Sequence, residues 1–449
     1  MSSFSAYQAF DSDSFPEHWQ VRRLRFAMKL NPSKKEVPLS DSELVSFVPM
    51  DAVGENGGIR LDEHKELGDI GSGYTYFRDN DVVVAKITPC FENGKGAIAK
   101  GLTNGCAFGT TELHVLRADL ELLEPNFLFY LTVSDWFRDL GESEMYGAGG
   151  QKRVPEDFIK NLVVGIPSKE EQKAIAGFLD RKTAQIDALI AKKQSLLDKL
   201  AEQRTALISQ AVTKGLDPSV PMKDSGVEWL GEIPEHWEIW KVTHGFNQIG
   251  SGTTPKSDNP LFFDGDVPWV TTSELREGTI FDTSQKVTEE ALAQYSALKL
   301  YPKGSLAIAM YGATIGRLGI FGVDATVNQA CCVYSQPTVF DTRFVYYWLW
   351  MRRPVLISLS NGGGQPNLSQ DDLKKLWIPI PDISEQKNIV QYLDKKVPQV
   401  DARITKVQTI IDKLNEYRSA LITNAVTGKI DVRDFCIPTT TEQREVAHG

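Results

Sequence analysis

An internal duplication is the feature that most constrains this chain. Residues 166–215 align with residues 380–429 without a gap, and about half of the aligned positions are identical. A shorter pair precedes them, because Phe15-Pro16-Glu17-His18-Trp19 corresponds to Ile233-Pro234-Glu235-His236-Trp237. One module therefore occurs twice, so a single polypeptide can build an object with an approximate two-fold axis. Such objects are suited to DNA or to two copies of a partner.

The composition is that of ordinary globular domains. The chain has 449 residues, of which 41% are hydrophobic and 24% charged, and this length can hold two to four domains. It contains neither a membrane-spanning apolar run nor a signal-peptide pattern, so we expect a cytoplasmic location and no membrane contact. Its five cysteines have no metal-ligand spacing, and we expect no metal site. The net charge of −10 means that any DNA affinity needs a local basic surface or basic partner subunits.

We expect an α+β fold, with two globular domains separated by two long antiparallel coiled-coil helices in a pseudo-two-fold repeat. Short β-like runs, at 81–87, 112–116, 306–310 and 330–334, and helical stretches, at 126–131 and 344–350, predict mixed domains. The expected segments are a globular domain over 1–165, a long helix over 166–214, a linker over 215–232, a globular domain over 233–379, a long helix over 380–430 and a polar tail over 431–449.

Both long helices carry apolar residues in heptads. The residues expected to pack are Leu179, Ile186, Leu197, Leu200 and Leu207 in the first copy, and Leu393, Val400, Val407, Leu414 and Leu421 in the second. Sustained heptads predict helix-on-helix packing, and the two copies are the obvious partners.

The ends and the interior of these helices also carry signals. Ser168 with Glu171, and Asp382 with Glu385, have the spacing of a capping box, in which the acid reaches back to the N-cap amide. Pro398 lies inside the second copy, and a proline there removes a backbone hydrogen bond. We therefore expect the second helix to be kinked or restarted at this residue.

Motifs of catalysis are missing from the sequence. It has no Walker A pattern, no Asn-Pro-Pro-aromatic tetrapeptide of the kind that amino-methyltransferases use, and no Ser/His/Asp arrangement. We expect no catalytic residue in this chain. For the histidines of the repeated Pro-Glu-His-Trp segment, His18 and His236, a structural role is the better interpretation.

Polar and basic residues near predicted strand ends are candidates for binding, because such side chains contact phosphates and base edges. Any one of them is more often an ordinary loop residue. In the first domain the candidates are Arg22, Arg23 and Arg25, from a basic stretch that also holds Lys29, Lys34 and Lys35, and then Lys86, Thr88, Thr110, Thr111, Gln151, Lys152 and Arg153. In the second domain they are Lys256, Thr271, Thr272, Ser273, Tyr311, Asn328, Gln329, Gln365 and Asn367.

Taken together, these segments closely resemble the specificity subunit of type I restriction-modification enzymes. The resemblance is carried by Glu171-Gln172 with Leu179-Asp180, by Glu385-Gln386 with Leu393-Asp394, by Arg-x-Ala-Leu-Ile at 204–208 and 418–422, and by the linker sequence VPMKDSGVEWLGEIPEHW. Each motif is modest alone, but their order is specific and covers nearly the whole chain.

The resemblance implies two target recognition domains, each reading one half of a bipartite double-stranded DNA target. It also implies that the helices set the spacing and dock two modification (methyltransferase) subunits. S-adenosylmethionine, ATP and magnesium would belong to these and to the restriction (translocase-endonuclease) subunits, and the assembled complex would methylate adenine and cleave DNA. Two alternatives remain: a single-chain DNA methyltransferase or nuclease with a similar recognition domain, and a coiled-coil adaptor. Two unlike globular domains are hard to explain in an adaptor.

Overall fold

The chain divides into two compact units. The structure, a computed structural model, describes residues 15–71, 73–148, 150–358 and 367–433. Unit 1 comprises Met1–Gln194 and Thr409–Gly449, and unit 2 comprises Ser195–Gln408. Each unit contains one globular α+β domain together with part of each long helix, α4 (Lys169–Lys214) and α8 (Ile383–Val426). Most of the predicted polar tail, residues 434–449, lies outside the described residues.

Two four-stranded sheets form the body of unit 1. The antiparallel sheet has the order β2 (Met28–Leu30), β9 (Leu113–Ala118), β6 (Val82–Ala85) and β7 (Gly96–Ile98). The mixed sheet has the order β4 (His64–Glu66), β3 (Leu44–Val48), β8 (Cys106–Gly109) and β5 (Thr75–Arg78), with β3 and β8 parallel. β6 is buried along its whole length, which is why its sequence is a continuous apolar run.

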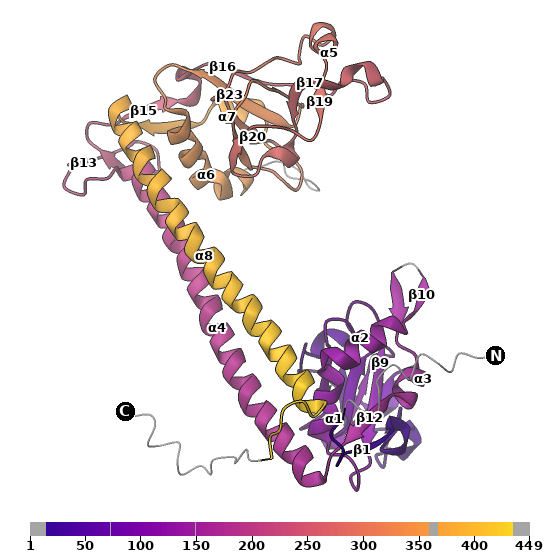
Figure 1. Cartoon of the computed structure of the whole chain (residues 1–449). Coiled ribbons are helices and arrows are strands. Elements are labelled where there is room, and N and C mark those ends of the chain that lie inside the picture. Colours follow the sequence, from indigo (N-terminus) through magenta and orange to yellow (C-terminus); the bar gives the residue numbers. More distant parts are fainter. Residues whose placement is uncertain (1–14, 72, 149, 359–366, 434–449) are drawn as a thin grey trace. The chain divides into compact units, whose positions relative to one another are not determined.

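Helices and two short strand pairs complete unit 1. They are α1 (Pro125–Val133), α2 (Asp135–Ser143) and α3 (Glu156–Asn161), the pair β1 (Gln20–Arg23) with β12 (Val163–Ile166), and the hairpin β10 (Tyr146–Ala148) with β11 (Gln151–Arg153). The two strands and the helix predicted for this domain are confirmed as β6, β9 and α1. Figure 1 shows the hairpin standing out from the body of the domain.

The domain of unit 2 repeats the plan with different additions. Its main sheet has the order β16 (Phe246–Ser251), β23 (Cys331–Pro337), β20 (Leu306–Ala309), β21 (Leu318–Phe321) and β18 (Gly278–Ile280). A second sheet has the order β19 (Lys286–Val287), β17 (Phe263–Val270) and β22 (Thr326–Val327). The remaining elements are the pairs β15 (Glu238–Lys241) with β24 (Trp377–Ile380) and β13 (Met222–Asp224) with β14 (Glu232–Pro234), and the helices α5 (Glu289–Gln294), α6 (Thr342–Ser358) and α7 (Gln370–Lys374). The predicted strands and helix are confirmed as β20, β23 and α6.

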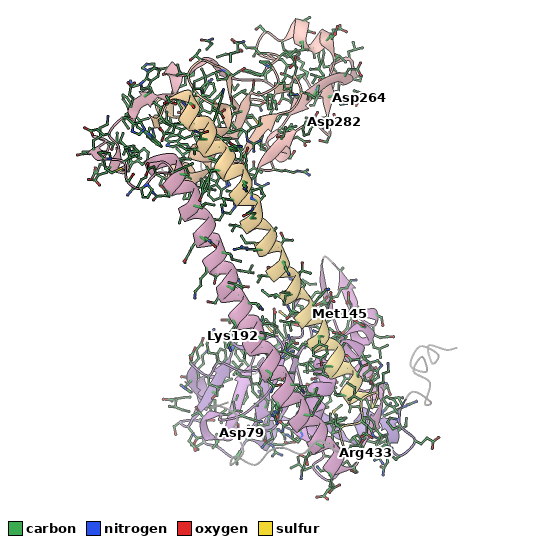
Figure 2. All side chains as sticks on the ribbon, turned by 60° about the vertical axis from the view of Figure 1, so that its left-hand side comes forward. Asp79, Met145, Lys192, Asp264, Asp282 and Arg433 are labelled. Carbon is green, nitrogen blue, oxygen red and sulfur yellow. The ribbon has the colours of Figure 1, made fainter. Side chains whose placement is uncertain are left out.

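The two long helices pack against each other in an antiparallel sense in each unit (Figure 1). In unit 1, Leu179 near the start of α4 shares a core with Leu421 near the end of α8. In unit 2 the relation is reversed, because Ile208 near the end of α4 shares a core with Leu393 near the start of α8. Seven of the predicted packing residues are buried, namely Leu179, Ile186, Leu200, Leu393, Val400, Val407 and Leu421, and three are half-buried, namely Leu197, Leu207 and Leu414. The outward side carries charged residues such as the exposed Lys192 (Figure 2).

Of the two alternatives predicted at Pro398, a kink or a restart, the restart is wrong. α8 runs without interruption from Ile383 to Val426, with Pro398 inside it. Pro398 is exposed, while Val397 and Val400 on either side are buried. The missing hydrogen bond therefore lies on the solvent side of the helix, where water can donate to the freed carbonyl. Packing of the apolar face maintains the helix.

Only half of each predicted capping box forms. Ser168 Oγ accepts from the Glu171 amide at 3.2 Å, and an Asp382 carboxylate oxygen accepts from the Glu385 amide at 2.8 Å. The glutamates do not reach back to the N-cap amides, so that part of the prediction is wrong. Their carboxylates bind the globular domains instead, at the repeated His-Trp pairs.

Candidate nucleic-acid interface

Strand ends bring most of the predicted residues of unit 1 together. β6 ends just before Lys86, and the Lys86 amide donates to the Glu112 carbonyl at 2.9 Å, directly ahead of β9. The Lys86 carbonyl accepts from the Val154 amide at 2.8 Å, which places the end of β11 alongside. The Thr110 amide in turn donates to the Val48 carbonyl at the end of β3. Segments far apart in sequence thus meet at one edge of the domain.

The hairpin β10–β11 is fastened to this edge by Thr88. The Thr88 hydroxyl accepts from the Lys152 amide at 2.7 Å and lies 3.1 Å and 3.2 Å from the carbonyls of Gly150 and Lys152. This contact matters because an isolated two-stranded hairpin is marginally stable in water. Within the hairpin, Tyr146, Gln151 and Lys152 are exposed. They stand where a partner macromolecule can reach them.

Arg153 is engaged within the protein. Its guanidinium makes two hydrogen bonds of 2.9 Å to the two carboxylate oxygens of Glu112. This bond is the main reason that the pKa of Glu112 lies below its usual value. Arg153 therefore holds the hairpin against the start of β9, and the exposed cation of the hairpin is Lys152.

A groove of about 250 Å³ opens beside this edge. Its lining includes Lys34, Lys86 and Thr111, together with the aromatic Tyr74. Lys34 entered the sequence analysis only as part of a basic stretch, and Tyr74 was missed, because no sequence pattern sets it apart from other surface tyrosines. Basic, hydroxyl and aromatic side chains in one groove are the chemistry of nucleic-acid contact.

The structure does not bring the arginines of the basic stretch to this groove. Arg22 and Arg23 lie on β1, which pairs with β12, and Arg25 follows β1 with its guanidinium 5.9 Å from the Phe26 ring. Figure 1 shows β1 at the end of the domain remote from the hairpin β10–β11. Of the cations in the stretch, Lys34 is the one that lines the groove.

Unit 2 assembles its predicted residues at the corresponding edge. The Asn328 amide donates to the Val270 carbonyl at 3.1 Å, which places Asn328 and Gln329 beside Thr271, Thr272 and Ser273. The Met310 amide donates to the Ala330 carbonyl, and Tyr311 forms a β-bridge with Asn367. Lys256 lies on the loop after β16, where the Thr254 hydroxyl donates to the Gln329 side chain at 2.6 Å, and the Lys256 amide donates to the Tyr295 hydroxyl. Gln365 lies outside the described residues.

The two edges share one backbone frame. The Lys86 backbone makes hydrogen bonds to Glu112 and Val154. The Met310 backbone makes the corresponding bonds to Ala330 and Leu368, and all four N–O distances are 2.8 or 2.9 Å. The bridge Ile87–Arg153 matches the bridge Tyr311–Asn367, and the Thr110–Val48 bond matches Asn328–Val270. The matching positions carry different side chains. The frame is repeated while the exposed chemistry is not.

Each domain is attached to the start of its own long helix by the same set of contacts. In unit 1, Glu171 accepts from the Trp19 indole at 3.0 Å and from His18 at 3.0 Å. In unit 2, Glu385 accepts from the Trp237 indole at 3.2 Å and from His236 at 2.8 Å. The repeated histidines thus have a structural role, whereas the capping-box spacing predicts only an N-cap contact for their glutamate partners.

A buried amide reinforces each attachment. Gln172 donates to the carbonyls of Leu122 and Pro167 and accepts from the Glu124 amide. Gln386 makes the same three kinds of bond in unit 2, to Val339, Pro381 and Asp341. A tyrosine hydroxyl makes a corresponding contact in each unit. Tyr130 donates to Asp180 at 2.7 Å, and Tyr347 donates to Asp394 at 2.7 Å. The repeated Glu-Gln and Leu-Asp motifs therefore fix domain to helix.

The part of the chain that the structure describes contains no cluster of three or more His, Cys, Asp or Glu side chains that could hold a metal ion. No helix among these residues has the length and apolar character needed to cross a membrane.

Comparison with known proteins agrees with this architecture. The family model for the type I restriction modification DNA specificity domain matches residues 16–198 and again residues 234–416. The EcoEI specificity subunit of Escherichia coli is 40% identical over 184 residues, which are 41% of this chain and 31% of the relative. The EcoAI specificity subunit of Escherichia coli is 35% identical over 230 residues, 51% of this chain and 38% of the relative. The matches thus span less than two-fifths of these two relatives.

More distant proteins match along nearly the whole chain. The putative MjaX specificity subunit of Methanocaldococcus jannaschii is 24% identical over 433 residues, 93% of this chain and 95% of the relative. A chain from a structure on complex assembly and conformational transition of the type I R-M system has a TM-score of 0.74 at 18% identity, covering 93% of this chain and 99% of that one. The HsdS subunit from Thermoanaerobacter tengcongensis has a TM-score of 0.54 at 18% identity, covering 93% and 98%. These likenesses show a shared fold.

Proposed function

Since the chain belongs to the type I restriction modification DNA specificity family, we propose that it is the subunit that recognises DNA in such a system. Each globular domain reads one half of a bipartite double-stranded target through the edge formed by its strand ends. The observation that carries this proposal is the shared backbone frame with unlike side chains, Lys86 and Arg153 in unit 1 against Met310 and Asn367 in unit 2. A common frame with different reading surfaces suits two different half-sites.

The long helices set the distance between the half-sites and dock two modification (methyltransferase) subunits. α4 has 46 residues, so at about 1.5 Å per residue it spans roughly 69 Å. The restriction subunits join through the same complex. S-adenosylmethionine, ATP and magnesium act on those partner subunits, and this chain has no catalytic residue or cofactor of its own. Such a complex works in the cytoplasm.

The methylation motif of the host genome tests recognition. Single-molecule sequencing of strains with and without the gene gives the motif, which we expect to be bipartite with an unspecified spacer and to disappear without the gene. Replacing Asn328 and Gln329 should alter one half of the motif and leave the other half and the spacer unchanged. A motif that persists without the gene would refute the proposal.

A matched pair of deletions tests the role of the helices. Removing one heptad from the middle of each helix, residues 192–198 and 406–412, keeps the apolar register and shortens the pair by about 10 Å. We expect both halves of the motif to survive with a spacer shorter by about three base pairs, at about 3.4 Å per pair. Removing three residues from each helix breaks the register and should abolish methylation. An unchanged spacer in the heptad variant would exclude the ruler role.

A further inference from the structure

Unpaired lysines gather at one of the two reading edges. Lys34 and Lys86 line the groove of unit 1 together, and Lys152 lies on the hairpin that Thr88 fastens beside it. Lys34 and Lys152 are exposed and Lys86 is half-buried. We call these three residues the lysine patch. Their ammonium groups make no ion pair or side-chain hydrogen bond within the described part of the chain.

Many other cations of this domain are paired within the protein. Lys29 pairs with Glu36, and Arg117 pairs with Asp81 at 2.7 Å. Arg153 pairs with Glu112 and Lys160 with Glu156, at the distances typical of charge-assisted hydrogen bonds, namely 2.9 and 2.7 Å. The lysine patch is thus a local excess of available positive charge on a chain with a net charge of −10.

Unit 2 carries no lysine at the matching positions. Met310 occupies the backbone position of Lys86, and it is buried. Asn367 occupies the position of Arg153, and the sequence places Pro366 beside it where unit 1 has Lys152. Two exposed cations stand near this edge at other positions, namely Lys256 on the loop that Thr254 bonds to Gln329, and Arg317 beside the end of β20.

The pairing of β2 with β9, and of β16 with β23, gives a third comparison, at Lys34. Leu30 pairs with Leu116 in unit 1, and Ile249 pairs with Tyr334 in unit 2. Leu116 and Tyr334 are equivalent, since they pair with the first residues of β6 and β20. Beyond this pair the two chains diverge, because β2 ends at Leu30 while β16 continues to Ser251. Counted along the sequence, Thr253 stands where unit 1 has Lys34.

We infer that the lysine patch contacts DNA phosphates, at positions where unit 2 has no lysine, so the two domains contact the DNA backbone through different residues. This inference rests on the proposed function. Each lysine that neutralises a phosphate releases condensed counterions, which makes binding depend steeply on salt. Neutral amides and hydroxyls read base edges without that dependence. The lysine patch therefore supplies salt-sensitive contacts in unit 1.

The salt dependence of binding measures these contacts directly. The complex of the full chain with its modification subunits is titrated with two duplexes over a range of salt concentrations. One duplex carries the motif that genome methylation identifies, and the other carries a scrambled sequence. Replacing Lys34, Lys86 and Lys152 by Thr, Met and Gln should reduce the slope of log K against log salt by about 0.9 for each lysine. Lys34→Thr and Lys86→Met introduce the residues of unit 2, and Lys152→Gln keeps the amide that bonds to Thr88.

Three controls separate the possible results. Lys100→Gln removes an exposed lysine at the other end of the same sheet and should leave the slope unchanged. Asn367→Lys adds a cation to the exposed edge of unit 2 and should steepen the slope by about 0.9. Arg22→Gln with Arg23→Gln tests β1 as the rival phosphate surface.

The outcomes are distinct. The inference is overturned if the slope is unchanged in the lysine variants, or if it is reduced only in the β1 variant. In either case, tighter binding to the motif duplex than to the scrambled duplex still supports the proposed function. Equal affinity of the natural complex for the motif and scrambled duplexes refutes the proposed function itself. The single variants and Asn367→Lys keep the test decisive if the triple variant does not fold.

Discussion

Arg418 of α8 donates from Nε to a carboxylate oxygen of Asp187 on α4 at 2.9 Å. Arg204 of α4 donates in the same way to Asp401 of α8 at 2.7 Å. The two pairs use the same two positions of the repeat, with the helices exchanged. This exchange is the pattern of a self-complementary two-fold contact between subunits, here built from one chain.

A charge reversal across this contact should reveal the coupling. Asp187→Arg and Arg418→Asp should each destabilise the protein modestly, by about 1 kcal/mol or less, because Asp187 is 53% exposed and water screens the pair. The double variant should recover most of that loss. Urea unfolding of the two single variants and the double variant gives the coupling energy. Strictly additive effects would show that the pair contributes nothing to stability.

Loss of Glu171 should loosen the domain from its helix. Glu171→Ala leaves the buried indole of Trp19 without an acceptor, which costs about 1 to 3 kcal/mol. Glu170→Ala removes an exposed carboxylate from the same first turn and serves as the control, with a loss of about 0.5 kcal/mol or less. Thermal unfolding compares them, and equal losses in the two variants would contradict the attachment role.

Pro398→Ala should stabilise the protein. The helix already runs through this exposed position, so alanine restores one backbone hydrogen bond and relieves the ring clash. The expected gain in the free energy of unfolding is about 1 to 3 kcal/mol. Ala184→Pro makes the reverse change at the matching position of α4 and should destabilise by a similar amount. A loss of stability in Pro398→Ala would mean that a bend at this proline is needed for packing.

The Glu112–Arg153 pair should give stability a dependence on acid. Arg153 lowers the pKa of Glu112 in the folded protein, so the folded state favours the ionised carboxylate. This contribution is present above the ordinary carboxyl pKa and is lost as the pH falls through the lowered folded pKa. Unfolding midpoints of the natural protein and Glu112→Gln, measured between about pH 6 and about pH 3, should converge as the pH falls. A constant difference across this range would contradict the linkage.

The long helices were predictable because heptad spacing is a local signal, readable from residues such as Leu393 and Leu421 without knowledge of the fold. The same local reasoning wrongly allowed a restart at Pro398, where burial of its neighbours outweighs one missing hydrogen bond. It also assigned Glu171 to its own N-cap, since the competing partners, His18 and Trp19, lie far away in sequence.

The strand-end edges of the two domains were predictable only in part. Polar residues after strands, such as Lys86 and Asn328, stood out because strand ends can be located from apolar runs. The grouping of Lys34 with Lys86 depends on strand order within a sheet, which composition does not encode. For the same reason the sequence did not show that Arg22 and Arg23, on β1, lie away from the groove that Lys34 and Lys86 line.

The shared cores also determine the order in which the protein can be completed during synthesis. The core of unit 1 includes Leu421, Ile422, Ala425 and Val426 from the end of α8, and the ribosome makes these after every residue of unit 2. Unit 2 takes Ile208, Ala211 and Val212 from α4, which are made before its own domain. Domains ordinarily finish in the order of translation. Here the first domain to emerge cannot complete its core until all of unit 2 has been made, so an apolar strip of unit 1 stays uncovered until then.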